Sequence, residues 1–341
     1  MTARVLGVGI HGAGTVSHQY IEAFAHNPHT AVRVLTSRTV ASAARRAEAA
    51  GLQCDVGDTL AAILDRDDVE IVVITTPNYL HAAEAVSVAC AGRHLIVEKP
   101  IALTEQALAD VVAAVETAKV VSQVGFVLRW NPMVDLARRL AGDGTLGDLV
   151  LAEAEYVHRL DPSRPGAAWK AGAETSGGAL LMAGCHAVDA LRYCAGEIVS
   201  VAAYATQRAR RDLEYPPTIA AALCFASGAV GRLAVTFEAY TPYLFNLHLY
   251  GSHGTLRNNR LYAVRLGGQT DYTEIPMVLP DSGEVTHHPF QAEVDDFVDA
   301  ILTGRPTRCP VTDAARTHEV CFAIERAWRE ARQVDLARMA K

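Results

Sequence analysis

The chain has 341 residues, of which 50% are apolar and 20% charged, a balance typical of a globular protein with a sizeable core. This length predicts two domains, because a single hydrophobic core seldom grows beyond about 300 residues. The 31 basic and 38 acidic residues give a formal net charge of −7, so neither nucleic acid nor membrane is an expected partner. With no apolar run near the roughly 20 residues of a membrane span and no recognisable signal sequence, we expect a cytoplasmic protein.

The seven cysteines are an odd number and include no Cys-x-x-Cys pair. The pattern favours neither a disulfide framework nor a zinc site. We therefore expect no bound metal and read most of these cysteines as reduced core residues.

The first 125 residues alternate short apolar runs with alanine-rich amphipathic stretches. The expected strands are residues 5–10, 32–35, 71–74, 95–97 and 120–124. The expected helices are residues 16–25, 41–50, 82–91 and 107–118. Repeated strand–helix–strand order predicts a parallel sheet with helices on both faces, so residues 1–125 are assigned to a doubly wound α/β domain.

The pattern changes in residues 126–341, which we assign to a second domain. Longer strands of alternating polarity are expected at 149–157, 199–206, 219–225, 230–237 and 244–250. Helices are expected at 132–140, 177–194, 291–302 and 312–330. Such strands, joined by turn-like segments, indicate an α/β domain with an open, mostly antiparallel sheet.

A glycine-rich turn follows the first expected strand and has the sequence Gly12-Ala13-Gly14-Thr15-Val16-Ser17. Gly12 permits a tight turn, Gly14 lets the backbone approach a pyrophosphate, and the helix that begins here offers unpaired N–H groups. Ser17 replaces the third glycine and is small enough for close packing. The turn predicts a dinucleotide site, although a glycine turn without a ligand has the same pattern.

The end of the second expected strand discriminates between the two nicotinamide dinucleotides. NAD sites usually carry an acidic residue here, whereas this chain has Ser37 and Arg38, followed by Thr39. The Arg38 guanidinium and the two hydroxyl groups are suited to a 2′-phosphate. NADP is therefore the preferred cofactor and NAD the alternative; a solvated arginine at a strand end would look the same.

Two further segments follow strands at the sheet edge where open α/β sheets bind ligands. One is Thr76-Pro77-Asn78 with His81, and the other is Glu98-Lys99-Pro100. We expect Thr76, Pro77, Asn78, His81, Glu98 and Lys99 to contribute to the cofactor site.

The order and spacing of these motifs resemble the Gfo/Idh/MocA (glucose-fructose oxidoreductase, inositol dehydrogenase, rhizopine catabolism) family. Later segments extend the resemblance: Arg129-Trp130-Asn131-Pro132, Trp169-Lys170, Gly184-x-His186-x-x-Asp189 and Gly251-x-x-Gly254-Thr255-Leu256. The resemblance implies an N-terminal Rossmann domain and a C-terminal α/β domain whose sheet mediates homodimers or homotetramers. It also implies hydride transfer between a nicotinamide cofactor and a hydroxyl or carbonyl of a sugar, inositol or related polyol.

By this resemblance Lys99 and His186 are the catalytic pair. Lys99 would hydrogen-bond the reacting hydroxyl, and His186 would exchange its proton, a task for which histidine is the side chain poised near neutral pH. Residues expected to contact the substrate are Arg129, His158, Trp169, Lys170 and Asp189. Asp189 is three residues from His186 and would orient the imidazole, bind substrate or simply lie on the helix surface.

One position departs from the family pattern. The family commonly has Asp four residues before the histidine, and here that residue is Met182, which cannot ionise. A helix over 177–193 would place Met182 one turn before His186 on the same face. Met182 therefore motivates an alternative, a nicotinamide-dependent binding or regulatory protein without turnover. A hydrolase or lyase that oxidises and restores its cofactor each turnover is a further alternative.

Overall fold

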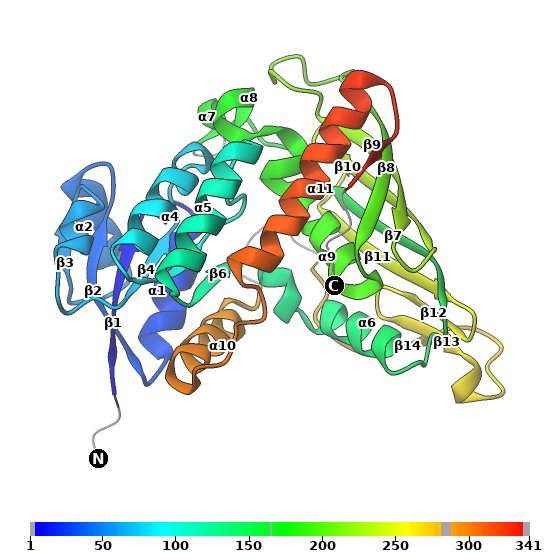
Figure 1. The fold of residues 1–341 in the computed structure, drawn as a ribbon, viewed down its shortest axis with the longest axis horizontal. Coiled ribbons are helices and arrows are strands. Elements are labelled where there is room, and N and C mark those ends of the chain that lie inside the picture. The colour runs from blue at the N-terminus through cyan, green and yellow to red at the C-terminus, as the bar shows by residue number, and fades with distance from the viewer. Residues whose placement is uncertain (1–3, 164–165, 281–287, 337–341) are drawn as a thin grey trace. The chain divides into compact units, whose positions relative to one another are not determined.

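The computed structural model describes residues 4–163, 166–280 and 288–336. The chain forms two compact units (Figure 1). The first comprises Met1–Val127 and Pro289–Ala315, and the second comprises Leu128–His288 and Arg316–Lys341. The change of pattern after residue 125 predicted one boundary there, with residues 126–341 in the second domain. The structure differs by returning 289–315 to the first unit.

The returning segment contains α10 (Phe290–Thr303), which packs against α1 (Ser17–His26). The rings of Tyr20 and Phe290 meet edge to face with centroids 5.1 Å apart. Both side chains are buried, so α10 completes the core of the first unit. Sequence order alone gave no sign of this return.

The first unit is built on a six-stranded sheet in the order β3-β2-β1-β4-β5-β6, and every pairing is parallel. Its strands are β1 (Leu6–His11), β2 (Thr30–Thr36), β3 (Asp55–Gly57), β4 (Ile71–Ile74), β5 (His94–Val97) and β6 (Ser122–Val124). Its further helices are α2 (Val40–Ala49), α3 (Ala61–Leu64), α4 (His81–Cys90) and α5 (Glu105–Ala118). This is the Rossmann strand order, so the predicted doubly wound domain is confirmed.

The strand order reverses between β1 and β4, where open α/β sheets bind their ligands. All four residues of β4 are buried, as expected for a strand covered on both faces. The carboxyl ends of β1, β2, β4 and β5 therefore bring the predicted motifs to one edge of the sheet.

The second unit is built on a nine-stranded sheet in the order β14-β13-β12-β11-β7-β10-β9-β8-β15. Its strands are β7 (Leu149–Val157), β8 (Ile198–Thr206), β9 (Thr218–Phe225), β10 (Val230–Thr236), β11 (Leu244–Gly251), β12 (Gly254–Arg257), β13 (Arg260–Ala263), β14 (Thr273–Glu274) and β15 (Val334–Asp335). Of the described pairings only β7 with β10 is parallel, so the mostly antiparallel sheet is confirmed.

One face of this sheet packs against helices. Its longer helices are α6 (Pro132–Gly142), α9 (Cys185–Ala195) and α11 (Val311–Glu330), of which α11 begins in the first unit. α9 packs against β7 and β11. In β9 exposed and buried residues alternate, with Ala220, Ala222 and Cys224 exposed, as expected for a sheet with one uncovered face.

The single helix expected over 177–194 is wrong in detail. Within that range the structure has a π-helical turn, η3 (Leu180–Gly184), followed directly by α9. Two short helices, α7 (Ala167–Ala171) and α8 (Ala173–Ser176), precede it. Gly177 and Gly178 have φ values of 78° and 76°, left-handed conformations that end α8. Because a π-turn bonds residues five apart, the spacing from Met182 to His186 is no longer one α-helical turn.

Candidate cofactor and catalytic site

The glycine turn lies against the end of β4. Gly12 has a φ of 111°, and a Cβ there would lie 2.6 Å from the carbonyl carbon and oxygen of Thr75. Its N–H donates to the carbonyl of Thr36 at 2.9 Å, and the Thr75 hydroxyl donates to its carbonyl at 2.8 Å. Only glycine fits this position, as a turn that cradles a pyrophosphate requires.

The helix that follows presents an open N-terminus. Val16 occupies the N-cap of α1 and makes no side-chain capping bond within the described chain. Gly14 and Thr15 are exposed and Ala13 is half-buried, so the turn that leads into the helix is accessible to a ligand. The Ser17 hydroxyl donates to the Gly14 carbonyl at 2.8 Å, which fixes the turn to the helix. This geometry fits a dinucleotide pyrophosphate.

The ribose-discriminating residues follow β2. Ser37 is half-buried and Arg38 is exposed, so both side chains are accessible from the sheet edge. Thr39 instead caps α2, its hydroxyl oxygen accepting from the N–H of Ser42 at 3.2 Å. A second guanidinium, that of Arg46, donates to the Gly14 carbonyl at 3.1 Å and adds positive charge beside the glycine turn.

His81 ties together the loops after β4 and β5. Its Nδ1 lies 2.7 Å from the Pro100 carbonyl and its Nε2 lies 2.8 Å from the Thr76 carbonyl. The side chain is 1% exposed, and burial lowers its pKa. We predicted that His81 contacts the cofactor. Its side chain is instead buried and bonded to both loops, which favours a role in supporting the Thr76-Pro77-Asn78 segment.

A chain of polar side chains that no sequence motif predicted crosses the same edge. His11 lies 2.6 Å through Nδ1 from the Thr36 hydroxyl and 3.2 Å through Nε2 from Glu84. The Thr76 hydroxyl donates to the other oxygen of Glu84 at 2.5 Å. The ends of β1, β2 and β4 are thus joined by side chains. The sequence signal for this network was His11, a histidine at the end of an otherwise apolar strand and directly before Gly12.

Glu98 and Lys99 follow β5. Glu98 is buried, and its carboxylate accepts from the Tyr20 hydroxyl at 3.0 Å and from the Lys99 N–H at 3.1 Å. Lys99 is half-buried, and its peptide bond to Pro100 is cis. Glu98 thus anchors the backbone of Lys99 from within the unit, which favours a supporting role over direct cofactor contact.

His186 lies in the first turn of α9 in the second unit and is 7% exposed. Its ring is stacked nearly parallel to that of Tyr156, with centroids 6.4 Å apart and an angle of 11°. Tyr156 also meets Tyr243 edge to face at 5.2 Å, and His158 lies 6.0 Å from Tyr243. Burial raises the pKa of both tyrosines, so their hydroxyls stay protonated at neutral pH. Aromatic rings thus join His186 and His158.

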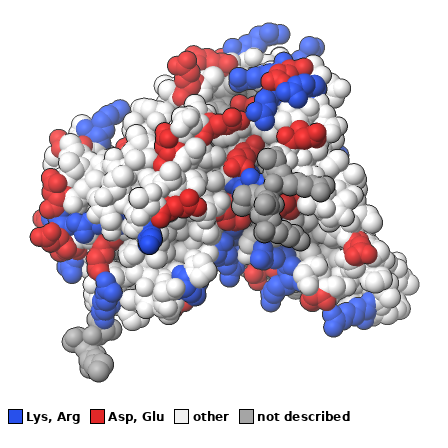
Figure 2. All heavy atoms as spheres, in the orientation of Figure 1, with Lys and Arg blue, Asp and Glu red and all other residues white. Residues whose placement is uncertain are grey.

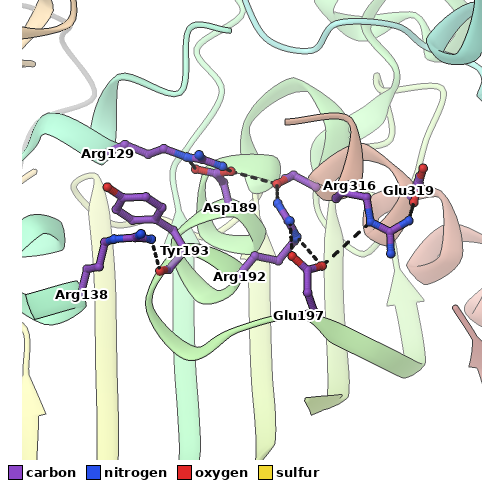
Figure 3. Close-up of polar contacts among 9 residues, drawn as sticks. Arg129, Arg138, Asp189, Arg192, Tyr193, Glu197, Arg316 and Glu319 are labelled. Carbon is purple, nitrogen blue, oxygen red and sulfur yellow. Dashed lines mark hydrogen bonds and ion pairs between the residues drawn. The ribbon is translucent and has the colours of Figure 1, made fainter. Parts of the chain in front are cut away.

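Arg129 and Asp189, both expected to contact substrate, instead contact each other (Figure 3). Arg129 donates from Nε to Oδ2 at 2.8 Å and from Nη2 to Oδ1 at 2.6 Å. The Thr317 hydroxyl of α11 adds a third bond to Oδ1 at 2.8 Å. Arg129 and Asp189 are 2% and 3% exposed, so the pair favours a role in holding α9 rather than in binding substrate.

The same network continues along α9 and α11. Arg192 donates from Nη1 to the Thr317 hydroxyl at 2.9 Å and pairs with Glu197 at 2.5 Å. Trp169 and Lys170 lie apart from it on α7, where the Lys170 Nζ is 5.6 Å from the Trp169 ring centroid. Lys99 belongs to the first unit, whereas the other expected catalytic and substrate residues belong to the second.

On the face drawn in Figure 2, basic and acidic side chains of the described residues are intermixed. No helix in the described part of the chain is long and apolar enough to cross a membrane. Among the same residues, no group of three or more His, Cys, Asp or Glu side chains is arranged to hold a metal ion.

Fold and glycine turn together define a dinucleotide-binding oxidoreductase scaffold. Residues 6–126 match the model of the oxidoreductase family with an NAD-binding Rossmann fold, and residues 134–257 match that of the GFO/IDH/MocA C-terminal domain. The chain therefore belongs to the GFO/IDH/MocA family of NAD-binding oxidoreductases, which confirms the resemblance seen in its motifs.

Named relatives are similar over most of the chain. Levoglucosan dehydrogenase of Pseudarthrobacter phenanthrenivorans is 28% identical over 74% of this chain and 73% of its own length. D-Xylose 1-dehydrogenase (NADP(+)) 2 of Haloferax volcanii is 27% identical over 88% of this chain and 90% of its own. The crystal structure of an oxidoreductase domain protein from Kribbella flavida superimposes with a TM-score of 0.89, at 25% identity, over 98% of this chain and 100% of that one.

Proposed function

We propose that the protein transfers hydride between NADP and a hydroxyl or carbonyl group of a sugar, inositol or related polyol. The observation that carries this proposal is the edge of the first sheet, where Gly12, Arg38 and Lys99 all follow the carboxyl ends of strands. The named relatives act on levoglucosan and D-xylose, which supports the substrate class.

The residues present fit a dinucleotide. The Gly12 position would be filled by any Cβ, and the N-terminus of α1 offers its N–H groups to a pyrophosphate. Arg38 and Ser37 would hold a 2′-phosphate, because no carboxylate stands at that position to repel it. NAD remains the alternative cofactor. When bound, the nicotinamide accepts or supplies hydride.

Within this proposal Lys99 donates a hydrogen bond to the reacting oxygen, and His186 takes the hydroxyl proton in oxidation or returns it in reduction. His158, Trp169 and Lys170 remain proposed substrate contacts. The mutual ion pair of Arg129 and Asp189 supports a different role, that of fixing the helix on which His186 stands.

The proposed assembly is a homodimer or homotetramer formed through the sheet of the second unit. The uncovered face of β8 and β9 carries small side chains, with Ala202 opposite Ala222, and an 84% exposed Tyr204. A surface of small and aromatic side chains with few charges suits association. Light scattering coupled to size exclusion measures the mass.

The cytoplasmic location expected from the sequence remains a prediction.

Screening sugars and cyclitols with both cofactors while following reduced nicotinamide tests the function. Formation of NADPH with at least one polyol supports it, and an inert protein that still binds NADP contradicts it.

Met182, buried in η3 where the family has an aspartate, favours the second candidate, a binding protein without turnover. Substrate conversion without net cofactor change would indicate the redox-cycling hydrolase or lyase.

A further inference from the structure

Three acidic or hydroxyl side chains meet inside the first unit, next to Lys99. Tyr20 comes from α1, Glu98 follows β5, and Glu293 comes from α10. Tyr20 and Glu293 are 0% exposed and Glu98 is 7% exposed. Gly125 makes the room, because a Cβ there would lie 2.8 Å from Glu98 Oε1 and 3.0 Å from the Tyr20 hydroxyl. The cluster is therefore sealed from solvent by close packing.

The two carboxyl groups have different partners. Glu98 receives two donors, the Tyr20 hydroxyl at Oε1 and the Lys99 N–H at Oε2, and Lys99 supplies a positive charge nearby. Neither carboxyl oxygen of Glu293 has a hydrogen-bond partner of normal geometry among the described residues. A carboxylate there would be a buried charge without a donor, and proteins avoid this state by protonating the group.

The polar neighbours of Glu293 suit a neutral acid. The Gln123 amide nitrogen donates to the Glu293 backbone carbonyl at 3.1 Å, while Gln123 Oε1 is buried without a partner among the described residues. The Tyr20 hydroxyl is the other polar neighbour, and its proton is already directed to Glu98. Both neighbours therefore offer acceptors, and only the protonated form of Glu293 supplies a donor for them.

Charge around the cluster points the same way. Burial raises the pKa of Glu293 well above its usual range, and the negative charge of Glu98 is the next largest effect and raises it further. Tyr20 and Gln123 oppose that rise, and Asp296 adds to it. Burial also raises the pKa of Glu98, but Lys99 and the bond from Tyr20 oppose that rise. When two close carboxyl groups share a buried site, the proton resides on the one with fewer partners.

We propose that Glu293 is a neutral carboxylic acid in the folded protein, and that it acts through Tyr20 to keep Glu98 as the charged acceptor that fixes the Lys99 backbone. Glu293 and Tyr20 are then positioning residues for Lys99. The link to turnover rests on the function proposed above, whereas the protonation state of Glu293 does not.

The same substitution at the two carboxyl groups tests the proposal through stability. Glutamine mimics a neutral acid, so Glu293→Gln melts within about 2 °C of wild type at pH 7, whereas Glu293→Ala melts about 5 °C lower or more. Glu98→Gln also melts about 5 °C lower or more, because its amide NH₂ faces one of the two donors. Glu22→Gln, an exposed change on α1, serves as control and leaves the melting temperature unchanged.

The pH dependence has a defined sign. A carboxyl group with a raised pKa in the folded state stabilises most below its unfolded value of 4.5, and that contribution falls as pH rises toward the folded value. Glu293→Gln removes this loss, so its melting temperature rises relative to wild type from pH 5 to pH 8. Glu22→Gln shows no such trend.

Infrared difference spectra read the proton directly and need no substrate. Wild type minus Glu293→Gln at pH 7 shows the carbonyl stretch of a protonated carboxyl, and wild type minus Glu22→Gln shows only carboxylate bands. Under the proposed function, Glu293→Gln retains turnover within about threefold, while Glu293→Ala lowers kcat with dinucleotide affinity unchanged.

Absence of the protonated band, or a Glu293→Gln variant that unfolds like Glu293→Ala, overturns the proposal. An inert wild type that shows the band and the pH trend refutes the proposed function and leaves the neutral Glu293 standing.

Discussion

Arg129 and Asp189 form a bidentate ion pair with N–O distances of 2.8 and 2.6 Å, and each side chain is almost fully buried. Sixty residues separate them in sequence. The pair joins the segment that opens the second unit to α9, and Thr317 extends the connection to α11. His186 stands one turn before Asp189, so its helix is held from two sides.

Breaking this pair should destabilise the second unit. Asp189→Asn leaves the Arg129 charge buried without its partner, and the expected loss in free energy of unfolding is about 3–5 kcal/mol. The control is Asp135→Asn, which breaks the surface pair with Arg139 and should cost less than about 1 kcal/mol. Denaturant unfolding measures both. If Asp189→Asn keeps wild-type stability but raises KM, Asp189 contacts the substrate after all.

Arg38→Ala should weaken NADP binding selectively, because a 2′-phosphate loses a charge-assisted partner whereas NAD carries no such phosphate. The expected loss is about 1.5–3 kcal/mol for NADP and almost none for NAD. Calorimetric titration of both dinucleotides measures it. Arg45→Ala, an exposed arginine on α2, is the matched control. Equal wild-type affinities for the two dinucleotides would defeat the NADP assignment.

Lys99→Ala and His186→Ala should each lower turnover by about 10²–10⁴-fold, the range that general acid–base groups contribute. Dinucleotide affinity should be largely retained, since neither residue forms the glycine turn. Both variants should stay folded, although His186→Ala should melt lower because it removes a buried ring that stacks on Tyr156. Steady-state kinetics with the substrate found in the screen, together with cofactor titration, measures the two effects separately. Near wild-type rates in both variants would remove these residues from the mechanism.

Met182→Asp should move the acid limb of the pH–rate profile to higher pH. The π-turn changes the spacing, but Met182 and His186 are still four residues apart and both buried in the continuous η3–α9 segment. A carboxylate at 182 therefore favours the protonated imidazole and raises its pKa, so a higher pH is needed to free the base. Met182→Asn is the uncharged control and should leave that limb in place. If wild type is inert and Met182→Asp turns over, the chain is a non-catalytic relative.

Gly12→Ala should abolish dinucleotide binding and destabilise the first unit, because its Cβ would overlap the Thr75 carbonyl at 2.6 Å and its φ is 111°. Gly92→Ala separates the two causes, since Gly92 has a φ of 68° but nothing within 4 Å of an added Cβ. It should cost only about 1–2 kcal/mol. Thermal unfolding with and without NADP measures stability and binding for both variants. If Gly12→Ala still binds NADP, the glycine turn is not the pyrophosphate site.

Elements with a strong local pattern could be predicted from the sequence. The strand 149–157 and the strand 71–74 coincide with β7 and β4, because alternation or continuous burial leaves a clear trace. β14 and β15 have two residues each and no periodicity of their own, so tertiary pairing alone creates them. The π-turn at 180–184 was missed for a similar reason, since its residues are all buried and show no face.

Motifs indicated which residues are candidates for the site, whereas contacts between residues far apart in the chain left no local sequence signal. Arg129 and Asp189 both stood in recognised motifs, yet nothing local showed that each was the other's partner. Glu293 had a usable signal: it lies between Phe290, Val294 and Phe297 on the apolar face of an amphipathic helix. A carboxyl group on such a face is expected to be buried, and a buried carboxyl group needs a polar partner or a proton.

The return of α10 to the first unit has a consequence for synthesis. Tyr20 and Gln123 are made early, but Phe290 and Glu293, against which they pack, leave the ribosome only after the whole sheet of β7 to β14. During synthesis the first unit therefore exposes the apolar surface that α10 later covers. A fragment ending at residue 127 exposes the same surface permanently and should aggregate. Supplying a peptide of residues 289–315 in trans should restore its solubility.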